Sequence, residues 1–74
     1  MRKRLRNRIR ETRAGRGISQ RELARVSGLA RQTIGVIERD DGYQPRGDVM
    51  VRLAEVLDAD LGSLFWTETD SVPT

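Results

Sequence analysis

Hydrophobic residues recur at helical spacing in short segments of the chain, and glycine-containing turns separate these segments. The clearest period is a stripe made by Val49, Leu53, Val56 and Leu57, with Ala54 beside it. The pattern predicts five helices: one capped by Asn7 and ended by Gly15 and Gly17, one between Ser19 and Gly28, one from about Ala30 to Asp40, one on the 49–57 stripe and a short one within 58–65. The predicted fold class is therefore all-α.

Ser19 marks the start of the second predicted helix. With Glu22 three residues later it forms an S-x-x-E capping box, in which the serine hydroxyl accepts a hydrogen bond from a backbone N–H of the first turn. Ile18 and Leu23 stand at the positions of a hydrophobic staple around this cap. These local signals agree with the periodicity.

The second and third predicted helices are each about two turns long, and only Ser27, Gly28 and Leu29 separate them. Gly28 can adopt a positive φ in this turn, and the small Ala24 lets the two helices approach closely. This is the geometry of a helix-turn-helix. The second helix of such a unit enters the major groove of DNA with its N-terminal residues first, which here are residues 30–33.

The composition argues against catalytic and metal-binding functions. The chain contains no Cys and no His, so it has no thiolate and lacks the commonest general base and metal ligand. No phosphate-binding glycine loop or hydrolase motif occurs, and Asp40, Asp41 and Asp48 lack the spacing of a calcium loop. We therefore expect no enzymatic activity, no metal and no cofactor.

Charge is distributed unevenly along the chain. Residues 1–17 carry eight Arg or Lys and one acidic residue, whereas residues 47–74 carry one Arg and six acidic residues. The basic segment favours a polyanion partner, and the alternative is an arm that only keeps the chain in solution. No apolar run is long enough to span a membrane, and the basic start lacks the apolar core of a secretory signal. The expected location is the cytoplasm, in association with the nucleoid.

Five positions stand in the register of a known family. The pattern Q-x-x-x-A-x-x-x-G-x-x-x-x-x-I-x-x-x-E is matched by Gln20, Ala24, Gly28, Ile34 and Glu38. Through this pattern the chain resembles the Cro/CI-type, or XRE-type, helix-turn-helix transcriptional regulators. The joint match is specific to the family, although each of its residues alone would not be.

The resemblance covers about residues 7–66 and implies a compact five-helix, lambda-repressor-like DNA-binding domain over residues 1–66, followed by a polar tail over residues 67–74. The chain looks most like the short stand-alone members, such as the cytolysin-operon repressor type, which are homodimers. We therefore expect a homodimer that binds a palindromic operator in double-stranded DNA.

The family pattern also implies roles for individual residues. It assigns base reading to Arg31, Gln32, Gly35 and Val36, contacts with the DNA backbone to Gln20, Thr33, Arg39, Tyr43 and Arg46, and a structural ion pair to Arg13 and Glu38. Gln20 could instead support the reading helix, and Arg31 and Gln32 could lie on an ordinary solvated face. The register match favours the base-reading interpretation.

Both ends of the chain carry a period of two, which is typical of strands. The segments RKRLRN and LFWTET have opposite charges, so antiparallel pairing would set Arg4 and Arg6 near Glu68 or Asp70. The resemblance places a small ribbon of this kind beside a dimer interface built from Leu61, Leu64, Phe65 and Trp66, of which Leu61, Leu64 and Phe65 are also expected to face inward. The alternative is a monomer with two frayed tails.

Together these features predict a sequence-specific regulator of transcription that represses by occluding its operator. The competing class is a protein-interaction module, either an antitoxin-type protein or an adaptor whose main role is to bind a protein partner.

Overall fold

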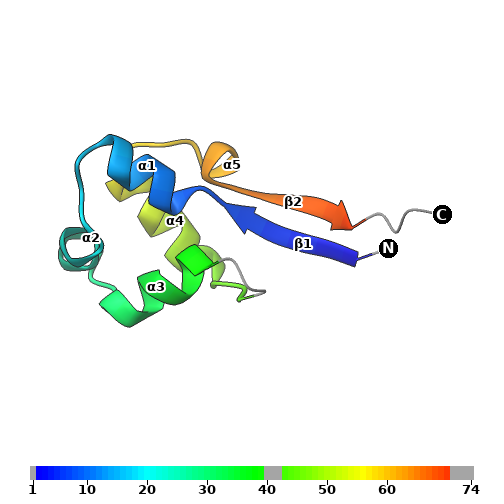
Figure 1. The fold of residues 1–74 in the computed structure, drawn as a ribbon, viewed down its shortest axis with the longest axis horizontal. Helices are drawn as coiled ribbons and strands as arrows, with labels where there is room; N and C mark the ends of the chain where they lie inside the picture. Colours follow the sequence, from blue (N-terminus) through cyan, green and yellow to red (C-terminus); the bar gives the residue numbers. More distant parts are fainter. Residues whose placement is uncertain (1, 40–42, 71–74) are drawn as a thin grey trace.

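The computed structural model describes residues 2–39 and 43–70 of the 74-residue chain. The described residues form strand β1 (Arg2–Asn7), helices α1 (Ile9–Gly15), α2 (Gln20–Ser27), α3 (Arg31–Arg39), α4 (Gly47–Val56) and α5 (Leu61–Leu64), and strand β2 (Phe65–Asp70). Figure 1 shows the helices gathered into one body, from which the two strands extend as a ribbon. The predicted five-helix fold with a small antiparallel ribbon is confirmed.

The hydrophobic core takes at least one side chain from every described helix. Its buried members are Ile9, Leu23, Ile34, Ile37, Leu53, Ala54, Leu57, Leu64 and Phe65. Within the predicted 49–57 stripe, which covers α4 and the residue after it, Leu53 and Leu57 are fully buried, whereas Val49 and Val56 are half-buried at the edge of the core. Burial of each large aliphatic side chain contributes about 1.5–3 kcal/mol, so this cluster is the main stabilising feature of a very small domain.

The predicted boundaries of α2 are confirmed. The Ser19 hydroxyl accepts a hydrogen bond from the Glu22 N–H at 3.0 Å, and Gly28 ends the helix in the left-handed conformation with φ of 73°. The Glu22 carboxylate accepts hydrogen bonds from Arg25. The glutamate half of the capping box is therefore directed to a neighbouring side chain.

The start of α1 differs from the prediction. Asn7 is the last residue of β1, paired with Phe65, and Arg8 occupies the N-cap position instead. Because the strand holds Asn7 in extended conformation, the helix begins later, at Ile9. The Asn7 side chain still accepts a hydrogen bond from the Ile9 N–H at 3.1 Å, and its amide donates to the Ile37 carbonyl at 2.9 Å.

Helix α3 spans Arg31–Arg39, close to the predicted range. The Ala30 carbonyl accepts from the Ile34 N–H at 3.2 Å, so the helical bonding begins at the predicted residue. Asp40, the predicted last residue, lies outside the described residues, as does Asp41.

The ribbon pairs Arg4 with Glu68 and Arg6 with Trp66 in antiparallel register. The Arg6 guanidinium lies 2.7 Å from the Glu68 carboxylate, a diagonal contact on one face of the ribbon. The alternative of two frayed tails is thus wrong for the described parts of both ends. Strand β2 crosses the boundary expected between residues 66 and 67, and residues 71–74 of the predicted tail lie outside the described residues.

Leu61 does not face inward as predicted, and 43% of its surface is exposed. Helix α5 lasts a single turn, and the chain becomes extended at Phe65. The residues at the end of the turn, Leu64 and Phe65, therefore enter the core, and the residue at its start is left on the surface.

Candidate nucleic-acid interface

The turn between α2 and α3 is fixed by contacts on both sides of Gly28. Ser27 is buried, and its hydroxyl donates to the Ala24 carbonyl at 3.4 Å and accepts from the Leu29 N–H at 3.3 Å. From α4, the Arg52 guanidinium donates to the Ser27 carbonyl at 3.4 Å. These contacts restrain the angle between α2 and α3, the two helices of the helix-turn-helix.

Helix α3 has one buried face and one exposed face. Ile34 and Ile37 are buried in the core. The opposite face carries Arg31, Gln32, Gly35, Val36 and Arg39, which recur at helical spacing. Arg31 and Gln32 are exposed on the first turn, and Gly35 and Val36 are partly exposed one turn later. The residues expected to read bases therefore share the solvent-facing side of the helix.

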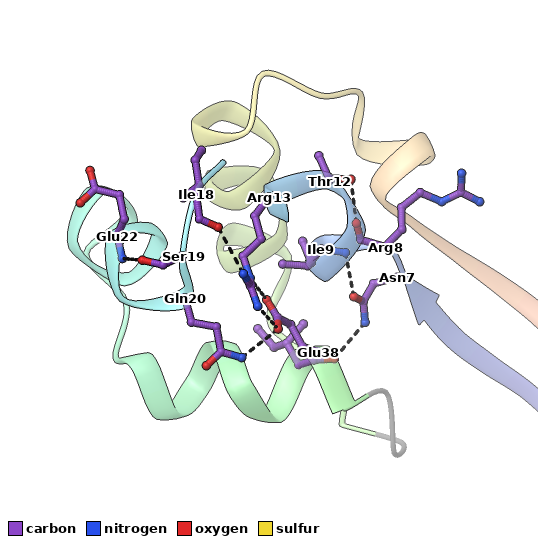
Figure 2. A network of polar contacts seen from close by, with 11 residues as sticks. Asn7, Arg8, Ile9, Thr12, Arg13, Ile18, Ser19, Gln20, Glu22 and Glu38 are labelled. Carbon is purple, nitrogen blue, oxygen red and sulfur yellow. Dashed lines mark hydrogen bonds and ion pairs between the residues drawn. The ribbon is translucent and has the colours of Figure 1, made fainter. Parts of the chain in front are cut away.

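Glu38 is a residue of α3, and its side chain joins this helix to α1 and α2 (Figure 2). Its carboxylate accepts hydrogen bonds from Arg13 Nε at 2.6 Å and from Arg13 Nη2 at 3.0 Å. The Gln20 amide donates to the same carboxylate at 2.8 Å, and Arg13 also donates to the Ile18 carbonyl at 3.2 Å. The Glu38 side chain is only 4% exposed. The expected partners Arg13 and Glu38 are thus brought together in a bidentate pair.

Burial alone would raise the pKa of the Glu38 carboxyl, because it disfavours the charged form. The hydrogen bonds from Arg13 and Gln20 and the attraction of Arg13 outweigh that effect, so the pKa lies below its ordinary value. The hydrogen bond to Glu38 in turn raises the pKa of Arg13. Both groups are therefore charged at neutral pH.

Gln20 lies beside Gly35 and Arg39 of α3, and its amide nitrogen donates one of its two N–H groups to Glu38. In this arrangement the side chain supports α3, one of the two roles that the sequence left open. The carbonyl oxygen of such an amide can accept but not donate, so a phosphate contact would have to use the amide nitrogen.

The remaining residues expected at the DNA backbone lie on two segments. Thr33 is partly buried on α3, and Arg39 is exposed at the end of that helix. Tyr43 is 45% exposed, and Arg46, also exposed, has its guanidinium 3.4 Å from the Asp48 carboxylate. Tyr43 and Arg46 follow residues 40–42, which lie outside the described part of the chain.

Arg10 is a further cationic residue at this surface that the residue-by-residue prediction missed. It lines a shallow depression together with Gln20, Gly35 and Arg39, and it is close enough to Glu38 to help lower the pKa of that carboxyl. Its spacing of three residues from Arg13 on α1 is the signal that could have identified it.

Within residues 2–39 and 43–70, no three His, Cys, Asp or Glu side chains come together in a way that could hold a metal ion. No helix in the same ranges is long and apolar enough to cross a membrane.

Comparison with known proteins identifies the family of the chain. The model of a helix-turn-helix family matches residues 9–64, which include α2, α3 and the turn between them. The chain belongs to this family. The XRE-type helix-turn-helix membership predicted from the spacing of Gln20, Ala24, Gly28, Ile34 and Glu38 is thereby confirmed.

Two relatives are HTH-type transcriptional regulators. YgzD of Bacillus subtilis is 30% identical over 67 residues, which cover 90% of this chain and all of YgzD. A regulator of Archaeoglobus fulgidus is 39% identical over 61 residues, 82% of this chain and 86% of its own length. The helix-turn-helix chain is accordingly a DNA-binding regulator of transcription.

A solved structure shares the fold. The restriction-modification controller protein C.AhdI from Aeromonas hydrophila superposes with a TM-score of 0.69 at 34% sequence identity, over 74% of this chain and 82% of that protein. The likeness extends beyond the helix-turn-helix to most of the helical body.

Proposed function

We propose that this helix-turn-helix protein is a sequence-specific, homodimeric repressor that acts in the cytoplasm, at the nucleoid, by occluding a palindromic operator. The observation that carries the proposal is the exposed face of α3, with Arg31 and Gln32 on its first turn and its other face pinned by Ile34 and Ile37. In a dimer, two such faces would enter major grooves about 34 Å apart, one helical turn of DNA.

In this proposal, the side chains of the reading face divide by chemistry. Arg31 and Gln32 can each form paired hydrogen bonds with a purine edge, and Gly35 and Val36 let the helix lie close to the bases. Thr33, Arg39, Tyr43 and Arg46 contact the sugar-phosphate backbone, and Arg10 adds a phosphate contact from α1. Gln20 holds α3 in place through Glu38.

The proposal of a dimer rests on the two-stranded ribbon. A two-stranded ribbon is barely stable by itself in water, so a surface that covers it would stabilise it. Trp66 is half-buried at its base, where the Arg8 guanidinium lies 4.7 Å from the centre of its ring. Leu64 and Phe65 support this region from within the core, whereas Leu61 lies apart in a hollow with residues of α4.

The experiment that tests the function is selection of bound fragments from random duplex DNA with the purified protein. A palindromic consensus with two half-sites one helical turn apart is the expected result. Uniform recovery of all sequences would contradict sequence-specific repression and would favour an adaptor or a non-specific binder.

Binding to duplex DNA should depend strongly on salt. A dimer whose Arg side chains neutralise about 6–10 phosphates gives a slope of the logarithm of affinity against the logarithm of salt concentration of roughly −5 to −9. Fluorescence anisotropy over a series of salt concentrations measures this slope. A slope near zero would contradict DNA binding through the Arg-rich surface.

Replacing Arg31 or Gln32 by alanine should relax the preference at single base pairs, because each side chain discriminates among bases by about 1–3 kcal/mol. Arg39→Ala is the matched control on the same helix, and it should weaken binding to all sequences alike, since a phosphate contact carries no base information. Competition between the selected operator and random duplex measures the difference. An equal loss on both duplexes for Arg31→Ala would refute its role in base reading.

A further inference from the structure

Strand β1 carries positive charge out to the tip of the ribbon. Lys3 and Arg4 are exposed, and neither forms an ion pair with another residue within 2–39 and 43–70. Glu68, which faces Arg4 across the ribbon, is paired with Arg6 at 2.7 Å instead. Among the side chains that the structure describes, the tip therefore presents two cations without a counter-charge.

The positive charge continues from the ribbon to the side of α3. Arg8 is exposed at the N-cap position of α1. Arg10, also exposed, lines the shallow depression that Gly35 and Arg39 of α3 share with it. No acidic residue occurs in the sequence between Lys3 and Arg10. A band of cations thus joins β1 to the helix that carries the proposed reading face.

The root of the ribbon lies against the end of α3. The Asn7 amide donates to the Ile37 carbonyl at 2.9 Å, so β1 starts beside the last turn of that helix. Figure 1 shows β1 on the α3 side of the ribbon and β2 on the α5 side. In the described sheet β1 pairs only with β2, so its outer edge faces the α3 side. With α3 in a major groove, this edge extends toward the phosphates beyond the last turn of α3.

The alternation of the strand favours an edge contact over a face contact. Lys3 and Arg4 are consecutive, so they point to opposite faces of the ribbon. A partner lying on one face would meet only one of them. A row of phosphates along the outer edge of β1 can meet both, because each charge stands at the end of a long, flexible side chain.

We propose that β1 is a second DNA contact of this regulator, in which the Lys3 ammonium and the Arg4 guanidinium bind phosphates beyond the C-terminal end of α3. The inference rests on the proposed function, since α3 is what brings the duplex alongside the ribbon. The contact adds affinity without base information and lengthens the footprint past the bases that α3 reads. Phosphates also neutralise the like charges at the tip, which stabilises an otherwise marginal ribbon.

The first test removes both charges with Lys3→Gln and Arg4→Gln. Each lost phosphate contact should make the slope of log affinity against log salt concentration about 0.9 less negative, so a dimer that loses four should change by roughly 3–4. Affinity at about 0.1 M salt should fall at least about tenfold, for operator and random duplex alike. An unchanged slope would overturn the proposal.

Two control variants show whether charge at this place is the cause. Lys3→Arg with Arg4→Lys keeps both charges and should retain the wild-type slope. Arg16 is an exposed cation whose guanidinium donates to the Asp58 carbonyl at 3.1 Å, in the segment between α4 and α5. Arg16→Gln should leave the slope unchanged, whereas Arg4→Gln alone should reduce it. Equal effects of these two single changes would overturn the proposal.

A merely structural role of the two cations gives a different result. A weakened ribbon would lower affinity by the same factor at every salt concentration, whereas lost phosphate contacts lower it most at low salt. Sedimentation of the Lys3→Gln, Arg4→Gln variant should give the wild-type mass. A salt-independent loss of affinity, or a fall in mass, would assign these side chains to the fold or to a subunit contact and overturn the proposal.

The position of the ribbon on DNA can be mapped directly. Thr69 is exposed and pairs with Lys3, and the chain contains no Cys, so Thr69→Cys introduces a unique thiol while both cations remain. An iron chelate attached there should cut the operator backbone beyond the base pairs read by α3. Wild-type protein treated with the same reagent is the control, and cutting no stronger than in that control would overturn the proposal.

Failure of the ribbon contact can be told apart from failure of the proposed function. Wild-type protein that binds no duplex at all would contradict both. Wild-type protein that selects an operator and loses its base preference on Arg31→Ala, but keeps its slope in the Lys3→Gln, Arg4→Gln variant, would overturn the ribbon contact alone.

Discussion

Replacing Glu38 by alanine lowers the free energy of unfolding by about 3–5 kcal/mol, the expected cost of breaking a buried ion pair from one side. The Glu38 and Arg13 side chains are only 4% and 15% exposed. Without the carboxylate, Arg13 loses two hydrogen bonds and Gln20 loses one. Urea unfolding followed by circular dichroism measures the change, which is a large share of the stability of so small a domain.

The double change Arg13→Met with Glu38→Leu is the informative control, since apolar side chains of similar size remove both charges together. It should recover much of the lost stability. Glu55→Ala is a matched glutamate on an exposed surface, and it should change the free energy of unfolding by less than about 0.5 kcal/mol. Equal stability of the wild type and Glu38→Ala would show that the pair does not stabilise the fold.

The Arg13–Glu38 ion pair also makes the stability of the fold depend on pH. The Glu38 pKa is lower in the folded chain than its ordinary value of 4.5. Its contribution to stability is therefore fully present above pH 4.5 and is lost as the pH falls through the lower, folded value. The Arg13→Met, Glu38→Leu variant should lose less stability than the wild type over that acidic range, as measured by melting temperatures. Parallel pH profiles for the two proteins would contradict the lowered pKa.

Deleting residues 66–74 removes most of β2 and should convert the proposed dimer to a monomer. Operator affinity should then fall by about 10²- to 10⁴-fold, because two half-sites are no longer bound by one linked unit. The helical core keeps Leu64 and Phe65, so the truncated chain should remain folded. Sedimentation gives the mass, and fluorescence anisotropy on the selected operator gives the affinity.

Removal of residues 71–74 alone is the matched control for this truncation, since it leaves β2 complete, and it should change neither mass nor affinity. Trp66→Ala tests the ribbon by a single side chain and should weaken the dimer in the same direction. A chain cut at residue 65 that still sediments as a dimer and binds the operator at full strength would refute the ribbon as the dimer contact.

Local signals in the sequence predicted most of the fold. The cap at Ser19 and the left-handed turn at Gly28 depend only on neighbours within four residues, so the sequence pattern was enough to locate them. The ribbon was predictable because its two segments carry alternating patterns and opposite charges.

Features that depend on distant parts of the chain were harder to predict. The start of α1 was placed too early because strand pairing, 58 residues away at Phe65, holds Asn7 extended. A helix of four residues is too short for periodicity to decide its buried side, so Leu61 was wrongly expected to face inward. The contact of Arg52 with the Ser27 carbonyl and the position of Arg10 near Glu38 arise only once separate helices pack together.

The residues expected to read bases were predicted from the family pattern, and in the structure they share one exposed face of α3. This part was predictable because helical spacing alone decides which residues share a side. The base that each side chain contacts is set by DNA geometry outside the chain. The roles of Arg31, Gln32, Gly35 and Val36 therefore stay predictions.

The side chain of Asn7 connects the ribbon to α1 and α3. It stands at the root of the ribbon, and its amide is bonded both to the first turn of α1 and to the last turn of α3. In a dimer joined through the ribbons, these hydrogen bonds of Asn7 would restrain α3 relative to the contact between the subunits. The two proposed reading helices then have a fixed orientation and separation. Adding one base pair between the half-sites moves them about 3.4 Å apart and rotates them by a tenth of a turn, so both helices can no longer enter their major grooves together. The fold would thus measure the distance between half-sites as well as their sequence.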